Sequence, residues 1–149
     1  MNPVFWLRCE VRKIAVFTGT RAEYGLLYWI IKGLNESNSV ELQLYVGGTH
    51  LSSEFGNTVQ QIEQDGFAIS DRLEFLIASD TPTGIAKSMG LALMVASEAF
   101  HRNKPDLLVV LGDRFEVMAI CQAAMLACVP IAHIHGGETT EGLIDEAVR

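Results

Sequence analysis

Short apolar stretches alternate along the chain with longer stretches whose apolar residues recur at helical spacing. The short stretches are rich in β-branched residues or are closed by glycine, and each has the length of a strand. The pattern predicts strands over 12–19, 40–48, 67–76, 106–112 and 130–137, and helices over 22–37, 54–66, 81–105 and 113–129. This regular alternation predicts an α/β fold with a doubly wound parallel sheet and right-handed crossovers.

Two details of the pattern support a sheet that is covered on both faces. The stretch "DLLVVLG" (106–112) is apolar without alternation, as expected for a strand buried on both sides. The helix expected over 81–105 has Pro82 near its start and Pro105 after its end, which is the usual placement of proline around a helix.

The length of 149 residues suits one domain. Residues 1–11 are interpreted as an extension ahead of the first strand, and 12–149 as an N-terminal Rossmann-like domain. After Gly142 the stretch "LIDEAVR" begins a helical pattern that stops without a cap. We therefore expect the sequence to be the N-terminal part of a longer protein.

Composition narrows the class of protein. Eleven basic against eighteen acidic residues give a net charge of −7, which argues against nucleic-acid binding. No apolar run reaches the roughly 18 residues of a membrane span, and the leader lacks a secretory h-region. The three cysteines, Cys9, Cys121 and Cys128, form no CxxC pair, so we expect buried thiols in a cytoplasmic protein.

Four segments follow the ends of predicted strands, where ligands bind in open parallel sheets. They are "TGTRAEYG" (18–25), "GGTHLSSE" (47–54), "GDR" (112–114) and "HIHGGETTEG" (133–142). Together they hold His50, His133 and His135, three of the four histidines. This clustering is the main indication of a site.

The first segment does not match a dinucleotide-binding fingerprint. Gly19 and Gly25 are six residues apart without G-x-G-x-x-G between them, and the second strand ends without an acidic residue. A tight turn, a helix N-terminus and Arg21 remain, and these suit a phosphate or diphosphate. A surface arginine at an ordinary turn is the equally acceptable alternative.

Asp113 directly follows an apolar strand and precedes a helix. With Glu116 three residues later it predicts an N-cap with a capping-box partner, a role that does not exclude catalysis.

His133 and His135 are two apart on a predicted strand, so both rings should point to one face. An H-x-H pair also occurs in metal sites, which leaves open a metallohydrolase with Asp113 or Asp145 as further ligands. The simpler interpretation makes His133 a hydrogen-bonded core residue and His135, at the strand end, a proton-transfer group. Asp145 is a candidate partner in acid–base chemistry.

Four motifs together resemble a known family. "KIAVFTGTRAEYGLL", "GGTHLS.EFGNT...I", "LVVLGDRFEVMA" and "IAHIHGGETTEGLIDEAVR" are similar, in order and spacing, to the hydrolysing UDP-N-acetylglucosamine 2-epimerases of bacterial sialic-acid pathways. The resemblance runs from about residue 12 to residue 149. It implies one Rossmann-like half of a two-domain GT-B-type enzyme, with the active site between the domains and a homo-oligomer as the full-length form.

The resemblance also implies a reaction. UDP-N-acetylglucosamine and water give N-acetylmannosamine and UDP: a base removes the C2 proton as UDP leaves C1, and water then adds to the 2-acetamidoglucal. No metal or redox cofactor is implied. The implied acid–base residues are Asp113, His135 and Asp145. The implied substrate-binding residues are Arg21, Ala22, Gly25, His50, His133, Gly136 and Glu138.

Alternatives stay open at this point. The same motifs fit a hydrolysing 2-epimerase of UDP-2,4-diacetamido-2,4,6-trideoxyglucose, and an inactive sugar-nucleotide-binding fragment or a metallohydrolase is the second alternative. Since the second domain of the family is absent from 149 residues, the chain alone should have half a cleft and negligible turnover. We further expect Asp113, His135 and Asp145 to converge on one pocket, and Gly136 and Gly137 to let backbone approach the ligand.

Overall fold

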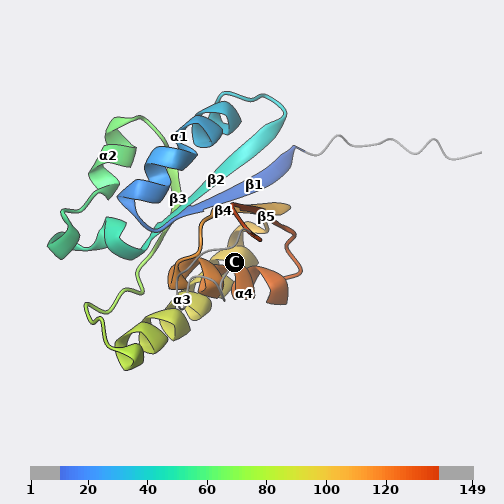
Figure 1. Ribbon diagram of the computed structural model, residues 1–149. Coiled ribbons are helices and arrows are strands. Elements are labelled where there is room, and N and C mark those ends of the chain that lie inside the picture. The colour runs from blue at the N-terminus through green and yellow to red at the C-terminus, as the bar shows by residue number, and fades with distance from the viewer. Residues whose placement is uncertain (1–10, 138–149) are drawn as a thin grey trace, which may run out of the picture.

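The computed structural model describes residues 11–137, and these form a parallel sheet between two layers of helices (Figure 1). The strands are β1 (Arg12–Thr18), β2 (Val40–Gly47), β3 (Ile69–Leu73), β4 (Leu107–Leu111) and β5 (Ile131–Ile134). The helices are α1 (Arg21–Asn35), α2 (Val59–Gln64), α3 (Pro82–Asn103) and α4 (Phe115–Leu126), with short 3₁₀ turns η1 (Gly48–Leu51) and η2 (Ser53–Phe55).

The strand order is β3-β2-β1-β4-β5, and every neighbouring pair is parallel. The chain builds outward from β1 through β2 to β3, then crosses back to place β4 on the other side of β1. The predicted doubly wound α/β fold is thus confirmed. The order reverses between β1 and β4, and in such sheets the crevice at this switch point is the usual ligand site.

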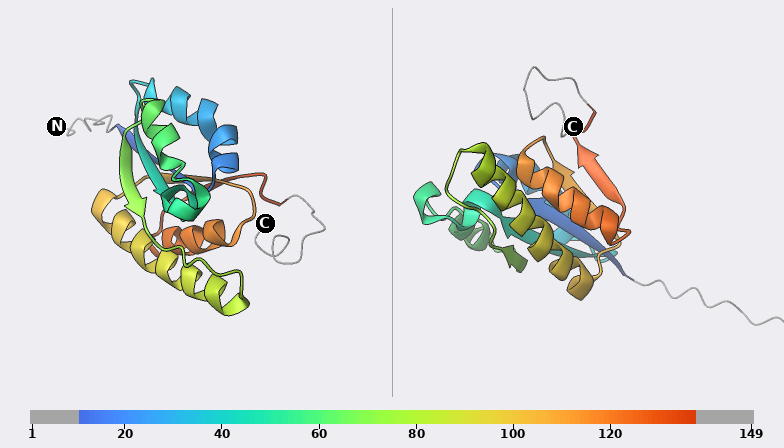
Figure 2. Two further views of the ribbon diagram at one scale, coloured as in Figure 1. Left: turned by 90° about the vertical axis from the view of Figure 1, so that its left-hand side faces the viewer. Right: turned by 90° about the horizontal axis from the view of Figure 1, so that it is seen from below.

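Alternating side chains of β1 explain why its sequence is apolar throughout. Ile14 and Val16 pack with α1 and α2 on one face, and Ala15 and Phe17 pack with α3 and α4 on the other. The two helical layers are seen in Figure 1 above and below the sheet, and Figure 2 shows α3 and α4 lying side by side across its second face. A strand that is buried on both faces requires apolar residues at both its odd and its even positions.

The helix boundaries follow local chemistry. α1 begins after Thr20 and α3 after Thr81, whose hydroxyls accept hydrogen bonds from the backbone N–H groups of Glu23 and Gly84 respectively. α3 has Pro82 in its first turn and ends at Lys104 in the left-handed conformation, directly before Pro105. This confirms the prediction from the two prolines.

Several predicted elements are longer than the real ones. The helix expected over 54–66 is η2 followed by α2, because Gly56 and Asn57 take positive φ values of 83° and 46° and interrupt it. The strand expected over 67–76 ends at Leu73, and the following residues form a loop that lines the site. The helical pattern after Gly142 lies outside the described residues.

The cysteine prediction was half right. Cys121 is half-buried in α4, and burial raises the pKa of its thiol to about 11. Cys128 is exposed, because it follows α4 in a turn with φ 56° instead of continuing the helix. Cys9 lies outside the described residues. Among residues 11–137, no helix has both the length and the apolarity that crossing a bilayer requires.

Candidate functional site

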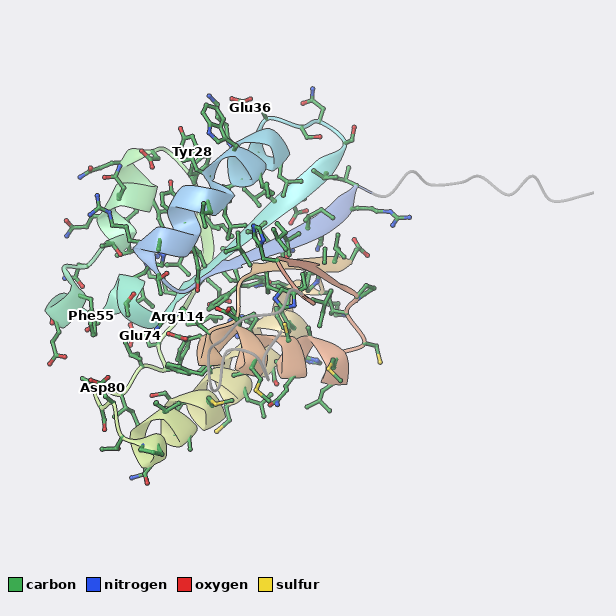
Figure 3. All side chains as sticks on the ribbon, in the orientation of Figure 1. Tyr28, Glu36, Phe55, Glu74, Asp80 and Arg114 are labelled. Atoms are coloured by element: carbon green, nitrogen blue, oxygen red, sulfur yellow. The ribbon has the colours of Figure 1, made fainter. Side chains whose placement is uncertain are left out.

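A cleft of about 740 Å³ lies outside the carboxyl ends of the central strands, at the switch point of the sheet. It is lined by Thr20, Arg21 and Ala22 after β1; Thr49, Glu54, Phe55 and Thr58 after β2; Leu76 to Asp80 after β3; Ile85 of α3; and Arg114 and Phe115 after β4. Phe55, Asp80 and Arg114, labelled in Figure 3, come from three separate segments of this lining. Three of the four segments singled out in the sequence contribute to it.

The first wall of the cleft is the start of α1. Thr20 caps the helix, and the carboxylate of Glu23 reaches back to accept hydrogen bonds from the N–H groups of Gly19 (2.8 Å) and Thr20 (3.2 Å). This capping box fixes Arg21 as the first residue of the helix, exposed beside the positive end of the helix dipole. Arg21 thus lies at the start of a capped helix, as the sequence pattern predicted, and its binding of an anion stays a prediction.

The second wall touches the first through backbone atoms. The carbonyl oxygen of Gly19 accepts hydrogen bonds from the N–H group (2.9 Å) and the hydroxyl (3.1 Å) of Thr49. Gly48 lies at this contact with φ 56°, and a Cβ there would be 2.7 Å from the Gly19 carbonyl oxygen. Only glycine allows the two turns to approach this closely.

His50 is completely buried beneath these turns. Its Nε2 pairs with the Thr18 hydroxyl (3.0 Å) and its Nδ1 with the Thr58 hydroxyl (2.7 Å). Burial lowers the pKa of His50 to about 4, so the ring is neutral near pH 7. It does not line the cleft, and its position suits support of the loop between β2 and α2 in place of the expected contact with substrate.

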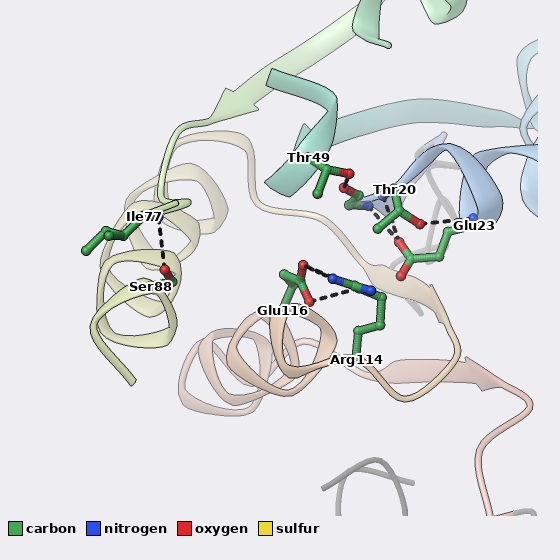
Figure 4. A network of polar contacts seen from close by, with 8 residues as sticks. Thr20, Glu23, Thr49, Ile77, Ser88, Arg114 and Glu116 are labelled. Atoms are coloured by element: carbon green, nitrogen blue, oxygen red, sulfur yellow. Dashed lines mark hydrogen bonds and ion pairs between the residues drawn. The ribbon is translucent and has the colours of Figure 1, made fainter. Parts of the chain in front are cut away.

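The third wall is the start of α4, where the structure has an ion pair between Arg114 and Glu116 and lacks the predicted cap by Asp113. The N-cap residue is Arg114, not Asp113, and no side chain caps this helix. Gly112 turns the chain with φ 84°, which places Asp113 one residue too early. Glu116, 1% exposed, binds the guanidinium of Arg114 through several contacts, among them Nη2 to Oε1 at 3.0 Å and Nε to Oε2 at 3.2 Å (Figure 4).

The fourth wall is the loop after β3, which the sequence pattern did not indicate as part of a site. Its backbone is held by the N–H group of Ile77, which donates to the Ser88 hydroxyl of α3 at 3.0 Å (Figure 4). Ser79 packs closely on Gly84: a Cβ added at Gly84 would lie 2.4 Å from the Oγ of Ser79. The loop contributes apolar side chains to the cleft lining, among them Ile77, which is 37% exposed, and Phe55 after β2, which is 54% exposed, lines the same cleft.

The histidine pair does not share one strand face as predicted. β5 ends at Ile134, and His135 lies in a turn with φ 58°, so the alternation that would align the two rings stops between them. His133 is half-buried, and its Nε2 donates to the carbonyl oxygen of Gly112, as expected of a hydrogen-bonded core histidine. Within residues 11–137, no three His, Cys, Asp or Glu side chains gather to hold a metal ion.

Gly136 has a structural reason to be glycine. A Cβ at this position would lie 2.5 Å from Nδ1 and 2.6 Å from Cγ of His133. The space it leaves is therefore occupied by the protein's own imidazole, and the expected approach of a ligand to this glycine stays a prediction. Gly25, in α1, has no atom within 4 Å of its would-be Cβ and does not line the cleft.

Asp113 and His135 directly follow Gly112 and Ile134, and the backbones of these two residues are joined by a hydrogen bond. The N–H group of Gly112 donates to the carbonyl oxygen of Ile134 at 3.1 Å, so the ends of β4 and β5 are neighbours. Asp145 and Glu138 lie outside the described residues. Convergence of the three acid–base candidates thus stays a prediction.

Comparison with known proteins gives a consistent result. A family model described as UDP-N-acetylglucosamine 2-epimerase matches residues 32–149. The chain belongs to this family. It is 40% identical over 139 residues to a hydrolysing UDP-N,N'-diacetylbacillosamine 2-epimerase of Legionella pneumophila, and 39% identical over 138 residues to a hydrolysing GDP/UDP-N,N'-diacetylbacillosamine 2-epimerase of Campylobacter jejuni.

These two matches cover 93% of this chain but only 37% and 36% of the relatives, so the chain spans little more than a third of their length. A crystal structure of the UDP-GlcNAc 2-epimerase of Methanocaldococcus jannaschii, in complex with UDP-GlcNAc and UDP, superposes with a TM-score of 0.76 at 24% identity. That match covers 92% of this chain and 36% of the other. The described part of this epimerase-family chain therefore has the family's Rossmann-like fold.

Two features beside the cleft of this epimerase-family chain were not predicted from the sequence, namely the buried Glu23 and the loop 76–80. The pattern Thr20-x-x-Glu23 is a capping box, a recognisable signal for the buried glutamate. The loop 76–80 carries no comparable pattern, because its apolar residues point into a cleft and follow no strand or helix period.

The close contact of the first two walls can be tested by replacing Gly48 with alanine. The added Cβ meets the Gly19 carbonyl and the residue must keep a positive φ, so we expect Gly48→Ala to lower the free energy of unfolding by about 2–4 kcal/mol in urea titrations. Gly66→Ala is the matched control, with φ 84° and nothing within 4 Å of the new Cβ, and it should cost about 1 kcal/mol. Equal losses in the two variants would contradict the importance of this contact.

Proposed function

We propose that this chain provides the Rossmann-like half of a hydrolysing UDP-sugar 2-epimerase, and that the sugar is a 2,4-diacetamido-2,4,6-trideoxyhexose. Support comes first from the two relatives at 39–40% identity, both named as N,N'-diacetylbacillosamine 2-epimerases. The observation that carries the proposal is the cleft itself, which combines Arg21 at a helix N-terminus with an apolar wall.

The diphosphate is assigned to the start of α1. Arg21 supplies a guanidinium, and the first turn of α1 supplies backbone N–H groups that lack partners within the helix. Arg114 lines the same cleft from the other side of the switch point. Because Glu116 balances the charge of Arg114, Arg21 and the start of α1 supply the positive potential for the diphosphate, and Arg114 is assigned a hydrogen-bonding role beside it.

The sugar is assigned to the wall formed by Phe55, Ile77 and Phe115. A 2,4-diacetamido-2,4,6-trideoxy sugar carries a methyl group at C6 and a second acetamido methyl at C4, where GlcNAc carries hydroxyls. Burying methyl groups against aromatic and aliphatic side chains is favourable, whereas burying unpaired hydroxyls is costly. UDP-GlcNAc, the substrate first expected, is thus the second candidate.

The reaction follows from the family. A base removes the proton at C2 while UDP leaves C1, water then adds to C1 of the unsaturated sugar, and a proton returns to C2 on the opposite face. Asp113 and His135 are proposed as two of the acid–base groups, supported by the backbone contact between the turns that carry them. Asp145 is proposed as the third.

The remaining length of the relatives has no counterpart in these 149 residues, so we propose that this chain alone turns over negligibly and binds UDP weakly. Oligomerisation of the full-length form stays a prediction.

The chemistry is tested by running the reaction in D₂O and in H₂¹⁸O with a full-length polypeptide that contains this chain. Elimination and hydration predict a sugar product with an inverted configuration at C2, one deuterium at C2 and one ¹⁸O at C1. NMR measures the configuration and the deuterium, and mass spectrometry measures the ¹⁸O. Retention of the C2 proton and configuration would indicate simple hydrolysis and contradict the proposal. Activity that depends on stoichiometric zinc would favour the metallohydrolase instead.

Substrate choice is tested with Ile77→Ser. The change removes apolar surface from the wall, so kcat/KM for the diacetamido-trideoxy sugar should fall about tenfold, and that for UDP-GlcNAc by less than about threefold. Ile30→Ser is the matched control, because Ile30 is also 37% exposed but lies on α1 outside the cleft lining. A loss of the same size for both sugars would contradict the assignment of this wall to the methyl groups.

A further inference from the structure

Glu23 is a buried carboxylate in the first turn of α1, next to residues that line the cleft, and one of its oxygens lacks a partner. The residue is 6% exposed. Its Oε2 accepts from the N–H groups of Gly19 and Thr20, whereas Oε1 is buried and has no hydrogen-bond partner. A buried oxygen without a partner is costly, and in a native protein it calls for an explanation.

The partnered oxygen holds together two walls of the cleft. It fixes the amide of Gly19, and the carbonyl of that same residue accepts both hydrogen bonds of Thr49. One carboxylate thus determines the backbone of both turns that approach at Gly48. If Glu23 takes up a proton on Oε1, its Oε2 remains a carbonyl oxygen that still accepts hydrogen bonds from the N–H groups of Gly19 and Thr20.

The unpartnered oxygen points into the space between α1 and the ion pair of the opposite wall (Figure 4). The charged groups that act on Glu23 are Glu116 and Arg114, both from the segment after β4. Glu116 is itself buried and binds the guanidinium of Arg114 through both carboxylate oxygens. Two buried carboxylates therefore compete for one guanidinium, a situation in which one of them retains a proton.

The pKa of Glu23 fits this arrangement. Burial, helped by the like charge of Glu116, raises the pKa of Glu23 to about 7 against the opposing effects of the Gly19 amide, Arg114 and the Thr20 amide. At neutral pH the group is thus divided between its two protonation states, and a nearby charge can shift it toward either one.

We propose that Glu23 is a positioning residue that takes up a proton when an anionic diphosphate enters the cleft. The ligand brings negative charge beside Arg21 and Arg114, which makes a second charge on Glu23 unfavourable. The proton comes from solvent and occupies Oε1, which then becomes a donor facing the Arg114–Glu116 pair, while Oε2 keeps both turns in place. The inference rests on the proposed function for the identity of the anion.

A helix cap with no part in binding is the alternative. In that case Glu23 would hold the turns at every pH, and its removal would weaken ligand binding by a constant factor. The proposal instead requires that ligand affinity depend on pH through this one group, a dependence that a purely structural role does not produce.

The test measures the affinity of a full-length polypeptide containing this chain for UDP-GlcNAc between pH 6 and pH 8.5. This probe is chosen because its diphosphate diester does not titrate in this range. The wild type should bind less tightly as the pH rises, by up to roughly tenfold for each unit by which the ligand shifts the pKa of Glu23. Glu23→Gln keeps the shape and the accepting oxygen, and its affinity should be independent of pH.

Glu36→Gln is the matched control, because it removes a carboxylate from the exposed end of the same helix and should behave as the wild type. An equal pH dependence in Glu23→Gln and the wild type overturns the proposal, as does a wild-type affinity that is constant with pH. If UDP-GlcNAc does not bind, the titration is repeated with the UDP-2,4-diacetamido-2,4,6-trideoxy sugar, whose diphosphate is the same. If neither sugar nucleotide binds at any pH, the proposed function fails and the linkage with it, whereas binding that is constant with pH overturns the linkage alone.

A second measurement needs no ligand. Carboxyl ¹³C spectra of the protein labelled at glutamate should contain one signal that is missing from Glu23→Gln and titrates near pH 7. A Glu23 signal that titrates below pH 5 overturns the proposal even if the variant folds and binds normally.

Discussion

The site depends on one backbone contact, in which the carbonyl oxygen of Gly19 accepts two hydrogen bonds from Thr49 across a gap that only glycine at position 48 leaves open. This contact joins the turn after β1 to the turn after β2, and so sets the distance between the start of α1 and the loop that carries Phe55. Glu23 fixes the same turn from the side of the helix. The cleft is thus formed by the ends of parallel strands and stabilised by hydrogen bonds between their turns.

Burial acts on the two titratable groups near this contact in opposite directions. It lowers the pKa of His50 to about 4 and raises that of Glu23 to about 7, since in both cases the charged form loses its hydration. His50 is therefore neutral and serves as a hydrogen-bonding link between Thr18 and Thr58. Glu23, without an ion-pair partner of its own, remains able to change its charge.

The order of strands and helices was predictable from sequence because both faces of β1 and β4 are buried, which gives long apolar stretches with clear boundaries. The ends of elements were less predictable, since positive φ values at Asn57, Gly112 and His135 end or redirect the chain without a strong sequence signal. For the same reason two predictions were wrong: that Asp113 caps α4, and that the rings of His133 and His135 point to one face of a strand. Arg21 and Ala22 line the cleft, and their contact with substrate stays a prediction. The apolar loop after β3 was not predicted as part of a site, because its residues face a cavity instead of the core.

The central claim is that the cleft at the carboxyl ends of the strands is where this epimerase-family chain meets a UDP-sugar. Amide chemical-shift mapping of the chain with UDP-GlcNAc tests it most directly, since weak binding suffices. The account predicts shifts concentrated at residues 19–22, 48–49, 76–80 and 114–115. Shifts concentrated instead around the cavity at the opposite end of the sheet, near Lys104 and Ala127, would contradict it.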